Sequence, residues 1–410
     1  MGEIVLPGGS APDGNRWLTR GVKGIGSASL LADVGHEIPT ALLPSLLSSL
    51  GAPAMALGAI EGISDALAGA ARFAGGALAD DPSRRRKVAV GGYTATAVLG
   101  AATAGATAVW QVGLLRAAAW TARGLRVPSR NALLADIVPA GAYGRAYGFE
   151  RMMDNLGAIL GPLVALGLVA WLGVTWAIAL SVIPGLLAAA AIVYAIRRTP
   201  RPRSRVRVPL RIRIRPVLRG ELGRLMAAVA AFEAGNVAVT LLILRASELL
   251  EPEYGTKTAT TIALGLYTGY NIAASLASVP AGRLADRLGR PGPVLVLAVG
   301  VAGFALSYGL LAVGAAAVAF LVFPFVLAGI GIGAVETAQH AAVAALSAED
   351  LRGSAFGLLA AIQSFGNLAA SVVAGVLWTA VSPTAAFAYA AVWMLPALAG
   401  LALSARRLGR

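Results

Sequence analysis

The sequence predicts an all-α integral membrane protein with twelve transmembrane helices in two pseudo-symmetric six-helix bundles. Three observations lead to this prediction. The 410 residues are 57% hydrophobic and 13% charged, whereas about a quarter of the residues in a soluble domain are charged. Apolar stretches of about 20 residues recur along the chain, and each can cross roughly 30 Å of hydrocarbon as a helix. The second half of the chain also repeats residue patterns of the first.

The apolar stretches are continuous rather than alternating, which favours helices over the strands of a membrane β-barrel. Residues 1–20 lack a long apolar core, so we predict no cleavable signal peptide. The chain has no cysteine, which excludes disulfides and thiolate metal sites. We expect spans at roughly 25–48, 54–77, 88–108, 110–130, 148–170, 174–196, 225–246, 259–280, 293–313, 316–340, 355–378 and 384–404.

A basic segment divides the chain near its middle. Residues 197–224 contain eleven arginines and no lysine, and so many charges are too costly for a membrane span. We therefore expect an N-terminal six-helix bundle in residues 1–198, a basic cytoplasmic linker in 199–222 and a C-terminal six-helix bundle in 223–410.

The other basic residues predict the orientation in the membrane. The loops at 81–87 and 286–290 and the C-terminal tail are also basic. The positive-inside rule then predicts a multi-pass protein of the cell inner membrane with both termini in the cytoplasm. Arginines placed between apolar spans favour contact with anionic membrane lipids, and we expect no nucleic-acid partner despite the net charge of +14.

An internal repeat relates the two halves. The matched positions are Asp33 with Glu233, Gly35 with Gly235, GGALAD at 75–80 with AGRLAD at 281–286, AYG at 146–148 with AFG at 355–357, and Gly157 with Gly366. The offset between matched positions stays between 200 and 209 residues. Parallel repeats of this kind place a substrate between the halves, near the middle of the bilayer.

One repeated run carries a known loop motif. GRLADRLGR at 282–290 resembles the motif G-x-L-A-D-R-x-G-R of the major facilitator superfamily, and GALAD at 76–80 opens the same motif in the first half. There the usual R-x-G is replaced by DPS at 81–83. The resemblance covers the whole chain and implies that superfamily's fold and a monomer. It also implies a conformational role for Gly76, Asp80, Arg84, Gly282, Asp286, Arg287, Gly289 and Arg290.

Two further features resemble the same superfamily. Arg116, in the fourth span, resembles the family's buried arginine. Gly157, Gly161 and Pro162, in the fifth span, resemble its antiporter pattern G-x-x-x-G-P, although the glycines that usually follow are absent. The resemblance further implies that spans one, four, seven and ten line a central cavity.

Charged residues inside the apolar spans are the candidate functional groups. A charge at mid-bilayer costs about 2.5–3.5 kcal/mol on the insertion scale, so it implies pairing, water or protonation. Pro39 lies close to three of them in the first span and removes a backbone donor, which predicts a bend or local opening of that helix. The candidates for proton coupling or substrate binding are Asp33, His36, Glu37, Glu61, Arg116, Glu233, Glu336 and His340.

Three functions are compatible with these residues. The first is a proton-coupled secondary active transporter that exports a small or cationic molecule, because buried carboxyl groups can carry protons and a net acidic cavity attracts cations. The second is a divalent transition-metal transporter, since imidazole with carboxylate suits such ions; its ligands would be His36, Glu37, Glu336 and His340. The third is a transporter-like receptor or lipid scramblase without ion coupling.

Structural roles compete with each of these functions. A histidine in the membrane can simply bond to a neighbouring helix. Asp33 or Glu37 can form a static ion pair with Arg116 or Arg151, and Asp154 is expected to pair with Arg151. The sequence contains no G-x-x-x-x-G-K-[ST], H-E-x-x-H or G-x-S-x-G, so we expect neither an ATP-driven pump nor an enzyme, and no cofactor.

Overall fold

The computed structural model describes residues 17–198 and 213–409, and within these ranges the chain is helical with no β-strand. Two short 3-10 helices, Thr103–Gly105 and Ala140–Ala142, lie between longer elements. The α-helices are α1 (Arg20–Ser49), α2 (Ala54–Ala79), α3 (Pro82–Ala102), α4 (Val109–Ile137), α5 (Tyr143–Leu180), α6 (Val182–Arg197), α7 (Ile214–Val217), α8 (Gly220–Glu233), α9 (Val239–Arg287), α10 (Gly292–Val313), α11 (Val318–Leu346), α12 (Arg352–Ala380) and α13 (Pro383–Leu408).

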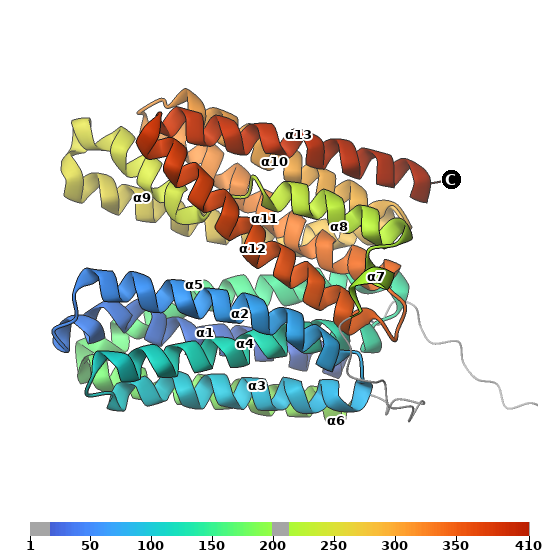
Figure 1. Cartoon of the computed structure of the whole chain (residues 1–410), viewed down its shortest axis with the longest axis horizontal. Helices are drawn as coiled ribbons and strands as arrows, with labels where there is room; N and C mark the ends of the chain where they lie inside the picture. The colour runs from blue at the N-terminus through green and yellow to red at the C-terminus, as the bar shows by residue number, and fades with distance from the viewer. Residues whose placement is uncertain (1–16, 199–212, 410) are drawn as a thin grey trace, which may run out of the picture.

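Two bundles lie side by side (Figure 1). Helices α1–α6 form one bundle and α8–α13 the other, and the short helix α7 lies near their junction. The interface between them is made chiefly by α5 against α9 and by α2 against α12. Much of the predicted basic linker, residues 199–212, lies outside the described residues.

The helices of the described ranges cover the twelve predicted spans. The sixth span is the end of α5, beyond a kink at Gly173, together with α6. The seventh is α8 with the start of α9, and the eighth is the rest of α9, beyond a kink at Gly255. Both kink glycines have positive φ values, 79° and 73°, which residues with a side chain rarely adopt.

Length and composition alone select fewer membrane-crossing segments. Seven helical stretches of the described chain are long and apolar enough to cross a membrane. The other predicted spans are not among these seven. Helices α1, α2 and α4 carry charged side chains along their lengths, and α8 has only 14 residues. Such charges at membrane depth are tolerated where they face the protein interior or water.

The first span, for which a bend or local opening was predicted, shows no local opening, and a different span is broken. Helix α1 continues through Pro39 and Pro44, and the Thr40 hydroxyl donates to the His36 carbonyl beside the first proline at 2.8 Å. The interruption lies instead in the seventh span, between the end of α8 at Glu233 and the start of α9 at Val239.

The two ends of the molecule differ in how the bundles meet. At one end, named here the closed end, α2 finishes and α12 begins, and glycines allow close contact: a Cβ added to Gly76 would lie 2.8 Å from the Gly353 carbonyl oxygen. Gly144 and Gly282 make the equivalent contact between α5 and α9, where an added Cβ would lie within 2.3 Å of backbone oxygen. The opposite end, which includes the α1–α2 connection and the α9 kink, is named the open end.

Candidate functional site

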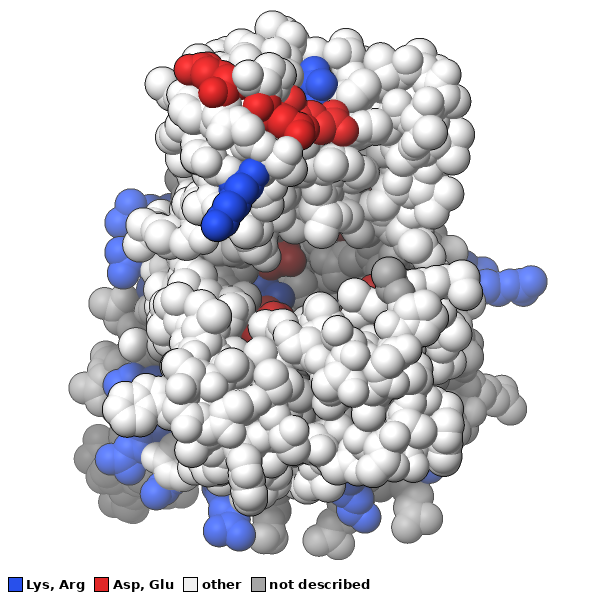
Figure 2. All heavy atoms as spheres, turned by 90° about the vertical axis from the view of Figure 1, so that its left-hand side faces the viewer, with Lys and Arg blue, Asp and Glu red and all other residues white. Residues whose placement is uncertain are grey.

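A central cavity of about 510 Å³ lies between the two bundles and is lined by residues of both. Viewed from the open end, the surface is hollowed between the bundles, with acidic and basic atoms inside the hollow (Figure 2). The lining contains five arginines and five acids, which are Arg72, Arg123, Arg126, Arg130, Arg151, Asp33, Asp65, Asp154, Glu233 and Glu336. The charges therefore balance, and the expectation of a net acidic cavity is wrong.

The closed end is fastened by the two motif aspartates in symmetry-related ways. Asp80 accepts hydrogen bonds from the Ser354 backbone N–H at 2.8 Å and from the Ser354 hydroxyl. Asp286 accepts from the backbone N–H groups of Gly144 at 2.7 Å and Arg145 at 3.0 Å. Each carboxylate thus meets the first turn of a helix in the other bundle, where negative charge is favoured.

The electrostatics of Asp80 reflect its burial at this interface. Burial raises the pKa of the Asp80 carboxyl above its ordinary value, while the hydrogen bonds from Ser354 and the charge of Arg213 act in the opposite direction. Arg213 lies 3.4 Å from Asp80 and 2.9 Å from Asp350, so it joins the two bundles at the closed end.

The remaining motif residues lie around these contacts. Arg84 pairs with the neighbouring Asp81 at 3.7 Å rather than with Asp80. Gly289 follows the end of α9 with a φ of 69°, and Arg287 is the last residue of α9. Arg290 lines a second cavity, of about 600 Å³, at the closed end.

Several intramembrane acids of the N-terminal bundle form ion pairs with arginines of α4 and α5, whereas Glu37 lies 3.7 Å from His36. Glu61 lies 2.9 Å from Arg116, and Asp33 lies 3.2 Å from Arg123. Asp33 therefore pairs with an arginine that the sequence analysis did not select. Nearer the closed end, buried Glu150 lies 2.8 Å from Arg130 and 2.7 Å from Arg151, and Arg151 also contacts Asp154 at 3.2 Å as predicted. Arg151 reaches Glu336 of the other bundle at 3.7 Å.

The C-terminal bundle contributes a carboxylate at the broken seventh span. Glu233 is the last residue of α8 and is 3% exposed. Its oxygens accept from the side-chain amides of Asn236 at 2.9 Å and Gln339 at 3.5 Å. Gln339 in turn accepts from Gln363 at 2.7 Å. The hydrogen-bond partners of this carboxylate are therefore amides.

Glu233 is distinct among the buried acids of the described chain. These are Asp33, Asp80, Asp81, Glu150 and Glu233. The first four each lie within 4.0 Å of an arginine nitrogen. No ion pair joins Glu233 to a described residue, and its hydrogen-bond partners are neutral.

Side chains of neighbouring helices form hydrogen bonds with backbone groups of the unwound residues 234–238. Asn367 of α12 donates to the Asn236 carbonyl at 2.7 Å, and the Ala238 N–H donates to Ser371 at 2.9 Å. The Tyr389 hydroxyl of α13 donates to the Ala234 carbonyl at 2.8 Å. Irregular backbone at membrane depth is tolerated where protein or a wet cavity satisfies it in this way.

The glycines of the antiporter-like pattern pack directly against the candidate acids. A Cβ added to Gly157 would lie 2.8 Å from Asp33 Cβ, and one added to Gly161 would lie 2.4 Å from Glu37 Cβ. Pro162 continues the same helix, α5. In the other bundle, a Cβ added to Gly366 would lie 2.5 Å from Glu233 Cβ. The two repeats therefore share this arrangement of acid and glycine.

Comparison with known proteins agrees with this architecture. The sequence model of the Major Facilitator Superfamily matches residues 25–250 and again residues 225–409, which together include both bundles.

The chain belongs to the major facilitator superfamily.

Its relatives and structural neighbours are consistent with that membership. The chain is 29% identical over 400 residues to an uncharacterized MFS-type transporter of Methanocaldococcus jannaschii, covering 95% of this chain and 96% of the relative. It is 30% identical over 374 residues to an uncharacterized protein of Mycobacterium bovis, covering 88% and 87%. This major facilitator chain is therefore a multi-pass membrane transporter.

Solved structures share the fold at low sequence identity. A bacterial homologue of the iron transporter ferroportin, in an outward-facing state, has a TM-score of 0.71 at 14% identity and covers 95% of this chain and 98% of its own. A human organic anion transporter has a TM-score of 0.72 at 16% identity, covering 95% and 100%. A proton:xylose symporter has a TM-score of 0.67 at 16% identity, covering 93% and 94%.

In this major facilitator structure the predicted metal ligands do not assemble. His36 packs edge-on against Trp120, with ring centroids 4.9 Å apart, beside Arg123. His340 bonds through Nδ1 to the Glu336 carbonyl at 2.6 Å. Within the described ranges, no group of three or more histidine, aspartate and glutamate side chains is placed to hold a metal ion. The arrangement of His36, Glu37, Glu336 and His340 therefore does not favour metal transport.

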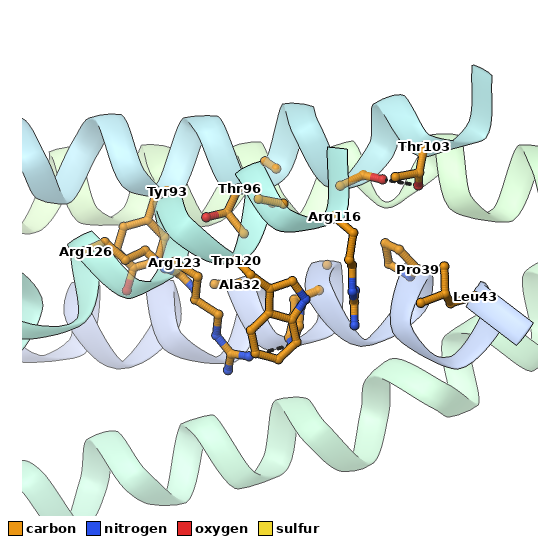
Figure 3. Close-up of a pocket in the computed structure, with 16 residues that line it drawn as sticks. Ala32, Pro39, Leu43, Tyr93, Thr96, Thr103, Arg116, Trp120, Arg123 and Arg126 are labelled. Atoms are coloured by element: carbon orange, nitrogen blue, oxygen red, sulfur yellow. Dashed lines mark hydrogen bonds between the residues drawn. The ribbon is translucent and has the colours of Figure 1, made fainter. Parts of the chain in front are cut away.

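Sequence reasoning missed most of the basic and amide groups of the cavity. Arg123, Arg126 and Arg130 follow Arg116 at helical spacing along α4, so their periodicity was the available signal. Figure 3 shows Arg116, Arg123 and Arg126 along one helix, with Trp120 between the first two. The guanidinium carbons of Arg116 and Arg123 lie 4.9 and 5.3 Å from the Trp120 ring centroid.

Proposed function

We propose that the chain is a proton-coupled secondary active transporter that works by alternating access and exports a small molecule. The observation that carries this proposal is Glu233, a buried carboxylate at a broken helix that has no basic partner among the described residues. The group lines the central cavity and is thus in reach of water that enters from the open end.

The physical reason for coupling is the cost of an uncompensated charge. While the cavity is open, water can solvate an ionised Glu233. Closing the open end removes that water, and burial of an unpaired carboxylate then costs several kcal/mol. Protonation removes this cost, so the proton binds before the cavity closes. Asp33 does not impose the same requirement, because Arg123 already balances its charge.

We propose that the closed end faces the cytoplasm. The basic residues at the helix ends, in 84–87, 283–290 and 406–407, lie there, as the positive-inside rule requires. Both termini are then cytoplasmic, and the structure is an outward-facing state. Protons reach Glu233 from outside, so their inward movement can drive a substrate outward. The resemblance of Gly157 and Gly161 to the antiporter pattern supports export. These glycines pack against Asp33 and Glu37.

The test follows the open end with a pair of spin labels. The chain has no native cysteine, so Met55→Cys at the start of α2 and Val381→Cys after α12 introduce the only two labelling sites. Both residues are exposed. In lipid nanodiscs, double electron–electron resonance should report a long distance between the two labels at alkaline pH. A shorter distance should gain population as the pH falls, because protonated Glu233 allows the open end to close.

Glu233→Gln mimics the protonated group, so its shorter-distance population should no longer depend on pH. Glu253→Gln, which removes an exposed carboxylate outside the cavity, should retain the dependence of the unsubstituted protein. A pH dependence that survives unchanged in Glu233→Gln would refute the assignment of the proton site. Distances that never change with pH in the unsubstituted protein would instead favour the receptor or scramblase function.

A further inference from the structure

One arginine of the central cavity lacks the partners that the others have. The buried arginines of the described chain are Arg85, Arg116, Arg126, Arg130, Arg151, Arg245 and Arg352. All but two lie within 4.0 Å of an acid, and Arg245 donates to the Leu311 carbonyl at 3.2 Å. Arg126 is 3% exposed, and its Nη1 is buried without a hydrogen-bond partner among the described residues.

The neighbour of Arg126 is another donor without an acceptor. Its guanidinium carbon lies 4.0 Å from the centroid of the Tyr93 ring, and Figure 3 shows the two side chains together at one end of a pocket. Tyr93 is 1% exposed, and its hydroxyl also has no hydrogen-bond partner in the described chain. Leaving buried donors without an acceptor costs free energy. A bound group that accepts hydrogen bonds from both side chains would remove that cost.

The space beside these donors connects them to the transport route. Arg126 and Tyr93 line a small pocket of about 30 Å³, and Arg126 also lines the central cavity. The pocket is bordered by small residues, among them Ala32, Gly35 and Ala97. Gly92 fixes the packing on the other side, because a Cβ there would lie 2.5 Å from Arg126 Cβ. Arg126 therefore lines both the small pocket and the central cavity, and close packing holds it there.

We infer that Arg126 and Tyr93 bind a carboxylate group of the transported substrate. Both side chains offer donors, and a carboxylate offers acceptors only. A guanidinium–carboxylate contact would also balance the charge of Arg126, which has no acid within 4.0 Å and no hydrogen-bond partner for Nη1 among the described residues. The small pocket has room for a group about the size of one or two waters, which suits carboxylate oxygens while the rest of the substrate occupies the central cavity.

The opposite wall indicates what the rest of the substrate is like. Gln363 and Asn367 line the cavity from α12, and side-chain amides both donate and accept hydrogen bonds. A small carboxylic acid with hydroxyl or amide groups matches both walls better than an apolar, drug-like cation. This inference deepens the proposed function, since it names the substrate class of the same cavity.

The test uses formate, the smallest carboxylate, as the probe. Melting temperatures of the purified protein are measured while formate replaces chloride at constant ionic strength, at a fixed pH near neutral. Formate should raise the melting temperature saturably, because a ligand of the native state stabilises it. In Arg126→Met the half-saturating concentration should rise at least about tenfold, the effect of losing one charge-assisted hydrogen bond. Tyr93→Phe should raise it about fivefold.

The melting temperature without formate separates an effect on binding from an effect on the stability of the fold. Without formate, Arg126→Met should melt no lower than the unsubstituted protein, because the substitution removes an unpaired buried charge. Arg406→Met, at the exposed end of α13, should respond to formate as the unsubstituted protein does. Equal responses in Arg126→Met and the unsubstituted protein, no saturable response in either, or a lower melting temperature of formate-free Arg126→Met would each overturn the inference. None of these outcomes bears on the pH dependence of the spin-label distance, which tests Glu233.

Discussion

Asp33 and Glu233 occupy equivalent positions in the two repeats, yet their surroundings differ. Each packs against the glycine that the repeat predicts, Gly157 for Asp33 and Gly366 for Glu233. Asp33 lies within the continuous helix α1 and contacts Arg123 at 3.2 Å. Glu233 ends α8 at a helix break, and its carboxylate accepts hydrogen bonds from the amides of Asn236 and Gln339. The repeat thus keeps the backbone packing while the charges have diverged.

This difference assigns different tasks to the two bundles. In the N-terminal bundle, Asp33 and Arg123 balance each other within the protein, so these two charges can stay fixed through the transport cycle. In the C-terminal bundle, Glu233 has no basic partner among the described residues, and under the proposed function a proton neutralises it when the open end closes. An unwound helix segment beside that carboxylate can also change its backbone hydrogen bonds at lower cost than a continuous helix. We therefore place proton coupling in the C-terminal bundle.

The largest expected effect is on stability at the paired acid. Asp33→Asn leaves the half-buried Arg123 without its acidic partner, so the free energy of unfolding should fall by about 3 kcal/mol. Glu233→Gln removes no ion pair and should change it by less than about 1 kcal/mol. Denaturant titration in mixed micelles measures both. The double variant Asp33→Asn/Arg123→Gln should recover most of the loss, whereas equal losses at Asp33 and Glu233 would erase the distinction between the two sites.

A basic side chain placed beside Glu233 should make its surroundings resemble those of Asp33. Asn236→Arg places a cation next to Glu233, whose carboxylate now accepts from Asn236 at 2.9 Å. The new pair should stabilise the ionised form by about 2 kcal/mol and remove the pH dependence of the open-end spin-label distance. Asn236→Gln serves as the control of similar shape. If Asn236→Arg kept the full pH dependence, the lack of a cation would not be what makes Glu233 respond to protons.

The shared glycines should behave alike in both repeats. Gly157→Ala and Gly366→Ala each bring a Cβ within 2.8 and 2.5 Å of the acid's Cβ, so each should lower the free energy of unfolding by about 1–2 kcal/mol. Gly167→Ala, where the new Cβ meets nothing within 4 Å, is the matched control on α5. A loss at only one of the two glycines would show that the repeats do not share this packing.

The closed-end contacts should give the smallest effect. Asp80→Ala removes the acceptor for the Ser354 N–H and hydroxyl, which should shift the balance between outward- and inward-facing states by about 1 kcal/mol. The open-end label distance should therefore shorten at every pH. Asp286→Ala should act in the same direction, because its bonds to Gly144 and Arg145 are equivalent. A longer distance in either variant would contradict the assignment of these contacts to the outward-facing state.

The sequence was sufficient for the fold because spans and repeats depend on composition and order alone. It was not sufficient for the pairing of charges. The structural alternative for Asp33 was an ion pair with Arg116 or Arg151, but the packing of α1 against α4 sets which arginine it meets, and that is Arg123. The break in the seventh span was also missed, because it depends on bonds from distant residues such as Asn367 and Ser371 rather than on a local proline.

The most direct test of the central claim is the protonation state of Glu233 itself. Infrared difference spectra, recorded between alkaline and acidic buffer, detect the carbonyl stretch of a protonated carboxyl group. We predict a band that appears on acidification, disappears in Glu233→Gln and persists in Asp33→Asn/Arg123→Gln. A band that survives in Glu233→Gln and is lost only with Asp33 would place the proton in the N-terminal bundle and contradict the account.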